Sequence, residues 1–141
     1  MGSFIKEFLG RLIDYLIILF LPKNKRDTGY LLLIRLDSIG DYVLFRNFIA
    51  VLKNSEKFKN YKIIFAGNII WKDIDEELDY EYIEKFVWID LKKFTNPLYR
   101  HKKLKELSSF GYEYVISPVN SRRFFYGDAI VRAVNGKKKI G

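Results

Sequence analysis

The chain has 141 residues, a formal net charge of +8 and 49% hydrophobic residues, enough apolar material for one domain with a packed core. It has no cysteine and one histidine, which excludes disulfides, thiolate zinc sites and cysteine nucleophiles and argues against a histidine-based triad. The positive charge favours anionic partners: phosphorylated sugars or lipids, nucleotides, nucleic acids or an anionic membrane surface.

Residues 4–21, FIKEFLGRLIDYLIILFL, carry apolar side chains at helical spacing. The charged residues of this segment fall on the other side of the helix: Lys6, Glu7, Arg11 and Asp14. The charge-free part begins at Tyr15 and falls short of the roughly 20 residues needed to cross a bilayer. We interpret residues 1–26 as an amphipathic helix followed by a basic linker. The helix either lies in the plane of an anionic membrane surface or packs against a protein domain.

From residue 27 to residue 141, apolar runs alternate with helical patterns. The runs predict strands at 30–36, 61–67, 85–90, 112–118 and from 137. The helical patterns predict helices at 41–53, 69–84, 97–109 and 122–135, with Gly136 ending the last one. The first run, YLLLIRL, is continuously apolar up to Arg35, as in strands buried on both faces of a parallel sheet. The alternation therefore predicts an α/β domain over residues 27–141, with a Rossmann-like parallel sheet and helices on both faces.

Two charged stretches have ordinary structural interpretations. The acidic stretch at 73–84, DIDEELDYEYIE, is interpreted as a solvated helix face, because it lacks the spacing of a calcium-binding loop. The basic stretch RHKKLK at 100–105 is interpreted as a helix with Leu104 on its buried side and lysines in water. No aromatic motif for RNA binding is present, so we expect no nucleic-acid partner.

The turn DSIGD, residues 37–41, joins the first strand to the first helix of the sheet domain. Proteins with parallel sheets bind ligands at the carboxyl edge of the strands, where such turns lie. The dinucleotide and P-loop glycine patterns are absent, since Gly40 is the only glycine of the turn. Asp41 has two interpretations: a carboxylate that accepts a proton from a bound hydroxyl, or a residue that caps the following helix.

Two stretches resemble glycosyltransferase family 9, the heptosyltransferase-like enzymes. LLIRLDSIGDYVLFRNFIAVLK, residues 32–53, is similar to the start of that family: an apolar strand, a basic residue, a turn with Gly-Asp and a helix. VISPVNSRRFFYGDAIVRAVNGKKKIG, residues 115–141, resembles a later part, with a strand, a polar turn, a helix and a basic strand. Residues 68–110 match the family only in layout.

The resemblance implies the first half of a GT-B fold, in which this domain binds the acceptor and a second domain binds a nucleotide-sugar donor. The implied reaction is the inverting transfer of a sugar such as heptose to a lipopolysaccharide-type or other cell-surface glycan, without a metal or another cofactor. Asp41 is implied to be the general base. The residues implied or placed to bind the substrate are Arg35, Ser38, Gly40, Arg122 and Arg123. The alternative interpretations are an ion pair of Arg35 with Asp37 or Asp41, and a solvated first helical turn for Arg122 and Arg123.

The implied partners are a nucleotide-sugar donor and an anionic glycan or glycolipid acceptor. We expect a cytoplasmic protein that is peripheral to the inner face of a bacterial membrane and contacts it through residues 4–21. The donor-binding domain is not found in these 141 residues, so the isolated chain is expected to be inactive. The alternative is a non-catalytic Rossmann-like module that binds a membrane surface or a protein partner. A third and less favoured hypothesis is a basic nucleic-acid binder, which steeply salt-dependent DNA affinity would indicate.

Overall fold

The computed structural model describes residues 2–20, 29–36, 39–117, 130–131 and 133–140. Its helices are α1 (Gly2–Phe20), α2 (Ile39–Asn54), α3 (Lys72–Leu78) and α4 (Pro97–Ser108), with a short 3₁₀ helix η1 (Ile69–Trp71). Its strands are β1 (Tyr30–Arg35), β2 (Lys62–Asn68), β3 (Lys85–Ile89), β4 (Gly111–Ile116) and β5 (Asn135–Ile140). Most of the helix predicted at 122–135 lies outside the described residues.

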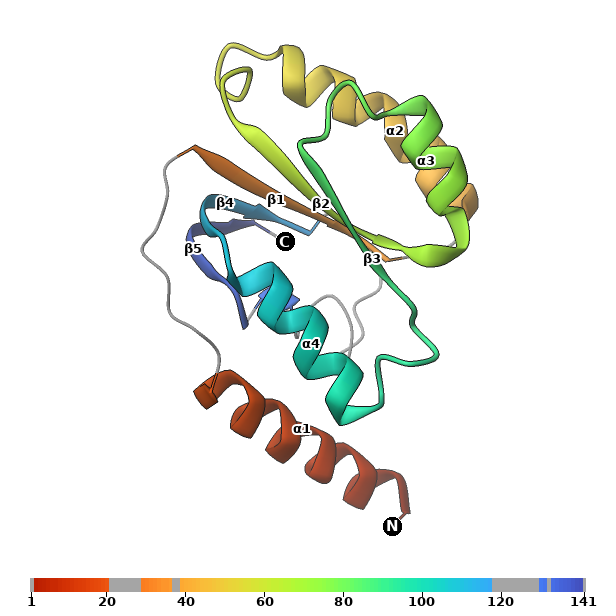
Figure 1. Cartoon of the computed structure of the whole chain (residues 1–141), viewed down its shortest axis with the longest axis vertical. Helices are drawn as coiled ribbons and strands as arrows, with labels where there is room; N and C mark the ends of the chain where they lie inside the picture. The colour runs from red at the N-terminus through yellow and green to blue at the C-terminus, as the bar shows by residue number, and fades with distance from the viewer. Residues whose placement is uncertain (1, 21–28, 37–38, 118–129, 132, 141) are drawn as a thin grey trace.

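The strands form one sheet in the order β3-β2-β1-β4-β5, and every pair is parallel (Figure 1). β1 is the central strand, where Leu33 lies opposite Phe65 of β2 and Ile116 of β4. The predicted α/β class, with a Rossmann-like parallel sheet, is therefore confirmed.

Both faces of β1 are buried, as its unbroken apolar run predicts. Leu32 and Ile34 point into the core on one face of the sheet, and Leu31 and Leu33 point into the core on the other. These four side chains are at most 1% exposed. Because successive side chains of a strand alternate between faces, one apolar strand supplies two cores, and helices must cover both.

The helices form layers on the two faces of this sheet. α2 and α3 lie side by side over one face, while α4 covers the other and α1 lies beyond it (Figure 1). The start of α4 follows the predicted pattern, since Pro97 is its first residue and Asn96 Oδ1 accepts a hydrogen bond from the Leu98 amide at 2.9 Å. α1 contacts the α4-side core through Ile13. None of the helices in the described ranges has the length and hydropathy of a membrane-spanning segment.

Two predictions about local structure are wrong. The helix predicted at 69–84 is much shorter: η1 leads into α3, which ends at Leu78, and a turn then leads to β3. Gly136 does not end a helix but lies within β5. A Cβ atom at this position would lie 2.6 Å from Cγ2 of Val115 on β4, so close packing between neighbouring strands accounts for the glycine.

The packing around Gly67 gives a stability prediction. A Cβ atom at Gly67 would lie 2.7 Å from a ring carbon of Trp88 and 3.0 Å from one of Trp71. Overpacking of this kind costs about 1–3 kcal/mol, so we expect Gly67→Ala to lower the free energy of unfolding by that amount in urea denaturation. Gly40→Ala is the matched control, because a Cβ atom there meets no described atom within 4 Å. Equal midpoints for the two variants would contradict the packing described for Gly67.

Candidate functional site at the carboxyl edge of strand β1

The site predicted from the sequence lies where the chain passes from β1 to α2. β1 ends at Arg35 and α2 begins at Ile39, so the first turn of α2 lies at the carboxyl edge of the central strand. α2 connects β1 to β2 on one side, whereas β4 pairs with the other side of β1. The order of the strands therefore reverses beside β1, and this reversal is where open parallel sheets bind ligands.

Asp41 is exposed in the first turn of α2. Because the helix begins at Ile39, Asp41 is its third residue and does not occupy the capping position considered from the sequence. A carboxylate in a first turn is still stabilised by the helix dipole. The side chain is exposed at the carboxyl edge of the sheet, the edge at which open parallel sheets in general bind ligands.

Gly40 is exposed beside Asp41, and the fold does not require a glycine there. No described glycine has a positive φ, so Gly40 adopts a conformation open to other residues. A Cβ atom at Gly40 would meet none of the described atoms within 4 Å. Glycine costs about 1 kcal/mol relative to alanine inside a helix, so alanine would suit the structure better. The missing side chain leaves space next to the Asp41 carboxylate.

The other predicted site residues are only partly described. Arg35 is half-buried at the end of β1, and its guanidinium carbon lies 4.5 Å from the centre of the Phe45 ring on α2. This cation–π contact places a positive charge at the same end of β1 as Asp41. Ser38, Arg122 and Arg123 lie outside the described residues, so their predicted roles stay predictions.

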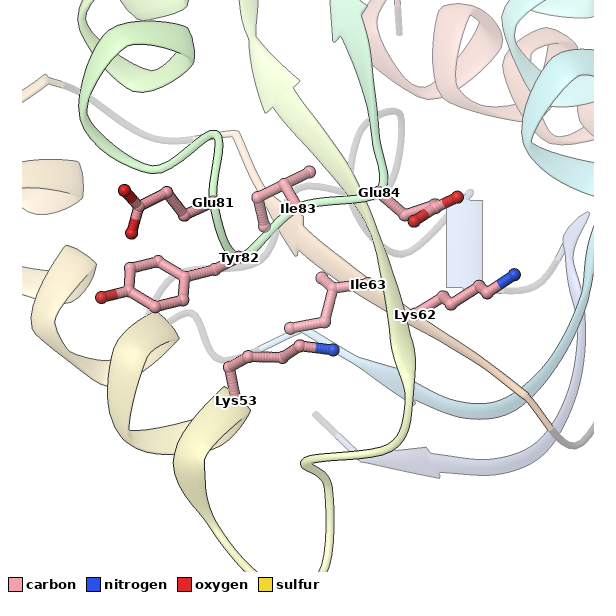
Figure 2. Close-up of a pocket in the computed structure, with 7 residues that line it drawn as sticks. All are labelled: Lys53, Lys62, Ile63, Glu81, Tyr82, Ile83 and Glu84. Carbon is pink, nitrogen blue, oxygen red and sulfur yellow. The ribbon is translucent and has the colours of Figure 1, made fainter.

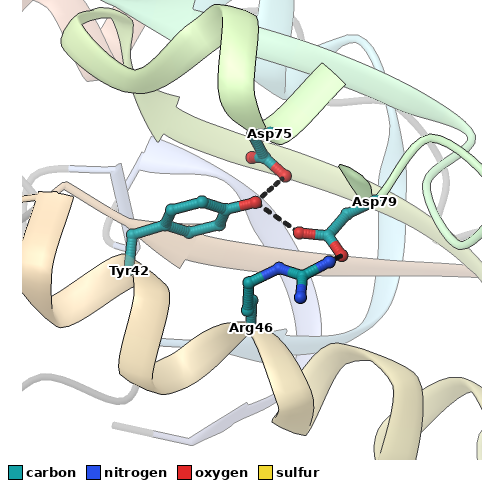
Figure 3. A network of polar contacts seen from close by, with 4 residues as sticks. All are labelled: Tyr42, Arg46, Asp75 and Asp79. Atoms are coloured by element: carbon teal, nitrogen blue, oxygen red, sulfur yellow. Dashed lines mark hydrogen bonds and ion pairs between the residues drawn. The ribbon is translucent and has the colours of Figure 1, made fainter. Parts of the chain in front are cut away.

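A polar cluster lies between α2 and α3, with buried carboxyls and a half-buried arginine. It consists of Tyr42 and Arg46 of α2, Asp75 of α3, and Asp79, the residue that directly follows α3 (Figure 3). The Tyr42 hydroxyl oxygen lies 2.8 Å from Oδ1 of Asp75 and also contacts Oδ2 of Asp79. Nη2 of Arg46 donates to Oδ1 of Asp79 at 3.0 Å. This cluster, called the α2–α3 cluster below, joins the first two turns of α2 to α3.

Burial dominates the electrostatics of the α2–α3 cluster. Asp75 is 0% exposed and Asp79 is 1% exposed. Burial raises the pKa of Asp75 to about 7, and the nearby Asp79 charge adds to the rise, whereas the Tyr42 hydrogen bond and Arg46 oppose it. Burial and the two carboxyls also raise the pKa of the Tyr42 hydroxyl, which stays protonated. The Tyr42 ring stacks on Trp71 at 4.3 Å between ring centres, which fixes the tyrosine from its apolar side.

The sequence interpretation missed this cluster because it treated the acidic stretch at 73–84 as a solvated face. Asp73, Glu76 and Glu77 are exposed as expected, but Asp75 and Asp79 are not. The missed signal is the matching four-residue spacing, since Tyr42 and Arg46 fall on one face of a helix and so do Asp75 and Asp79. A hydroxyl and a guanidinium at the same spacing as two carboxyls on a neighbouring segment are compatible with pairing.

A small pocket lies at the other end of the sheet. Its lining residues include Lys53 at the end of α2, Lys62 at the start of β2 and Glu84 just before β3 (Figure 2). Its volume is about 70 Å³, room for a few water molecules. The pocket therefore lies at the amino edge of β2, away from the predicted site, and its size suits no sugar.

Comparison with known proteins does not assign this chain to a family or a function. No protein-family model, curated protein or solved structure matches this chain. Among the described residues, no group of three histidine, cysteine or carboxylate side chains is placed to hold a metal ion.

Gly40 provides a test that separates a binding role from a structural one. We expect Gly40→Ala to leave the free energy of unfolding unchanged or to raise it by up to about 1 kcal/mol, because the added methyl group has space and alanine favours the helix. The same methyl group should weaken binding of a ligand next to Asp41, which NMR titration with a phosphorylated oligosaccharide would measure. Loss of stability without loss of binding would indicate a structural role for this glycine.

Proposed function

We propose that this chain is the acceptor-binding domain of an inverting, family-9-like glycosyltransferase, with Asp41 as its general base. The observation that carries the proposal is the position of Asp41: exposed, in the first turn of the helix that follows the central strand of a parallel sheet. That position combines a ligand-binding edge with a carboxylate that can accept a proton. The resemblance of residues 32–53 to the start of that family supports the same assignment.

In the proposed reaction, a hydroxyl oxygen of the acceptor attacks the anomeric carbon of a nucleotide sugar. The new glycosidic C–O bond forms as the bond from the anomeric carbon to the diphosphate breaks, which inverts the configuration at that carbon. The hydroxyl proton passes to the Asp41 carboxylate, and the nucleoside diphosphate leaves with the bonding electron pair. A donor-binding domain holds the nucleotide sugar, so transfer requires that domain together with this one.

Positive charge contributes by holding an anionic acceptor. Arg35 is fixed against Phe45 at the end of β1, so its charge is oriented before the acceptor binds. The proposed acceptor is an anionic cell-surface glycan or glycolipid of the lipopolysaccharide type. The net charge of +8 is consistent with this choice.

The general-base proposal predicts a large effect of Asp41→Asn on transfer. The amide cannot accept the proton, so we expect the rate to fall by about 10²–10⁴-fold. The assay measures nucleoside diphosphate release from a nucleotide sugar in the presence of a lipopolysaccharide core oligosaccharide and the donor-binding domain. Acceptor binding should persist or improve, because a negative charge is removed beside an anionic ligand.

Asp73→Asn is the matched control, since Asp73 is also an exposed aspartate in the first turn of a helix, α3. It should leave transfer unchanged. Full activity of a folded Asp41→Asn protein would overturn the base assignment.

The alternative of a non-catalytic membrane-surface module is favoured by one specific observation, the exposed apolar face of α1. Its side chains are exposed by between 44% and 73%: Phe4, Ile5, Phe8, Leu9, Leu12, Tyr15 and Leu16. Ile13, by contrast, packs against the domain. A wide apolar face on a helix with Lys6 and Arg11 suits the interface of an anionic membrane. Membrane binding through α1 is compatible with both the glycosyltransferase and the non-catalytic module, whereas sugar transfer is expected only of the glycosyltransferase.

Membrane binding through α1 is tested by a double substitution, Phe4→Ser with Phe8→Ser. Both side chains are more than half exposed, so the change should leave thermal stability unchanged. Cosedimentation with vesicles of phosphatidylglycerol and phosphatidylethanolamine should fall by about tenfold or more, because each buried phenylalanine contributes roughly 1.5–3 kcal/mol. Unchanged cosedimentation would exclude this face as the membrane contact.

A further inference from the structure

In the α2–α3 cluster, two contacts between oxygen atoms each need a proton, but the Tyr42 hydroxyl supplies only one. The Tyr42 hydroxyl has one proton, yet its oxygen lies within hydrogen-bonding distance of both the Asp75 and the Asp79 carboxyl groups. If both carboxyls were ionised, one of these two oxygen–oxygen contacts would lack a proton. Two acceptors without a proton between them repel each other, and burial makes that repulsion stronger.

One additional proton removes this conflict. A proton on Asp75 is donated to the Tyr42 oxygen, and Tyr42 then donates its own proton to Asp79. Asp79 also accepts from Nη2 of Arg46 at 3.0 Å, so the guanidinium faces this carboxyl and not that of Asp75. Asp75 is the carboxyl that takes the proton, since no cation contacts it among the described residues and its Oδ2 atom is buried without a hydrogen-bond partner.

We propose that the α2–α3 cluster is a proton-dependent latch: Asp75 holds a buried proton near neutral pH, and loss of that proton loosens the contact between α2 and α3. The chain of donors runs from Asp75 through Tyr42 to Asp79, where Arg46 balances the remaining charge. The latch goes beyond the proposed function, because it depends on the contacts of these four side chains and not on any reaction.

The groups around Asp75 support this assignment. Tyr42 and Arg46 face it from α2, and Asp79 faces it from the end of α3. The same core contains Phe65 of β2, Trp71 of η1 and Trp88 of β3, which carry no charge. Glu76 of α3 is engaged elsewhere, since its Oε1 accepts from the Trp88 indole at 2.6 Å. An ionised Asp75 would therefore share a single cation, Arg46, with Asp79.

The direction of the pH effect follows from the raised pKa of Asp75. The folded protein holds this proton up to about pH 7, whereas an aspartate in the unfolded chain releases it near its usual value of 3.8. Between these values the folded state binds more protons, so rising pH favours unfolding. The stabilising contribution is full below the unfolded value and is lost as the pH rises through about 7.

The test compares the wild-type chain with Asp75→Asn by urea denaturation from about pH 5 to about pH 8. Asparagine imitates the protonated carboxyl, because its amide can donate to the Tyr42 oxygen. We expect the ratio of folded to unfolded wild-type protein to fall, relative to that of Asp75→Asn, by up to about tenfold per pH unit, the limit for one proton. Asp73→Asn, an exposed aspartate on the same helix, should keep the wild-type slope.

A direct observation of the proton guards against a variant that fails to fold. In wild-type protein labelled with ¹³C at the aspartate carboxyls, NMR should show one carboxyl that titrates near neutral pH, and Asp75→Asn should remove that signal. The latch is overturned if all aspartate carboxyls of the folded wild type titrate below about pH 5, near their usual values. It is also overturned if a folded Asp75→Asn protein keeps the wild-type pH dependence of stability.

One consequence of the latch rests on the proposed function. Tyr42 follows Asp41 directly on α2, so a loosened latch would move the turn that carries the general base. Transfer by the wild type should then decline above neutral pH relative to transfer by Asp75→Asn. If no transfer is found for either protein, the proposed function fails, while the stability and NMR measurements still decide whether the latch exists.

Discussion

The burial of β1 on both faces is the constraint on which the rest of the structure depends. Leu31, Leu32, Leu33 and Ile34 are at most 1% exposed, so neither face of the strand can be left to water. Complete burial of each such side chain stabilises the fold by about 1.5–3 kcal/mol. Strands must therefore flank β1 on both sides and helices must cover both faces. The carboxyl end of β1 becomes the point where the strand order reverses, which makes it the natural position for a binding site.

α2 has two roles set by its two sides. Its buried side carries Tyr42 and Arg46 into the α2–α3 cluster, with Trp71 stacked on the tyrosine ring. Its first turn presents Asp41 to solvent. A carboxylate on a firmly packed helix keeps its orientation better than one on a loop, because the packing of neighbouring residues fixes the backbone. The arrangement therefore suits a group that has to meet a reacting atom at short range.

The sequence was sufficient to predict the sheet, because strands in a parallel sheet are recognisable from local composition. The runs at 30–36 and 61–67 are mostly apolar, with Arg35 and Lys62 as their charged residues, and match β1 and β2 to within a residue. The position of Asp41 at the edge of β1 followed from the same reasoning. Where prediction failed, the deciding contact lay far along the chain. Asp75 is buried because of Tyr42, 33 residues before it, and Gly136 is needed because of Val115 on the neighbouring strand.

Asp75 and Asp79 are buried although both side chains are acidic. Two carboxyls are costly inside a core, and hydrophobic residues of similar size would often be no less stable. Because the α2–α3 cluster adds little net stability, we interpret its role as fixing the arrangement of α2 and α3. It fixes the rotation of α2 about its axis, because only one face of that helix carries both a hydroxyl and a guanidinium. Because Asp41 is on the same helix, that rotation sets the direction in which its side chain leaves α2. The buried Asp75 and Asp79 carboxyls therefore influence the position of the exposed Asp41 carboxylate.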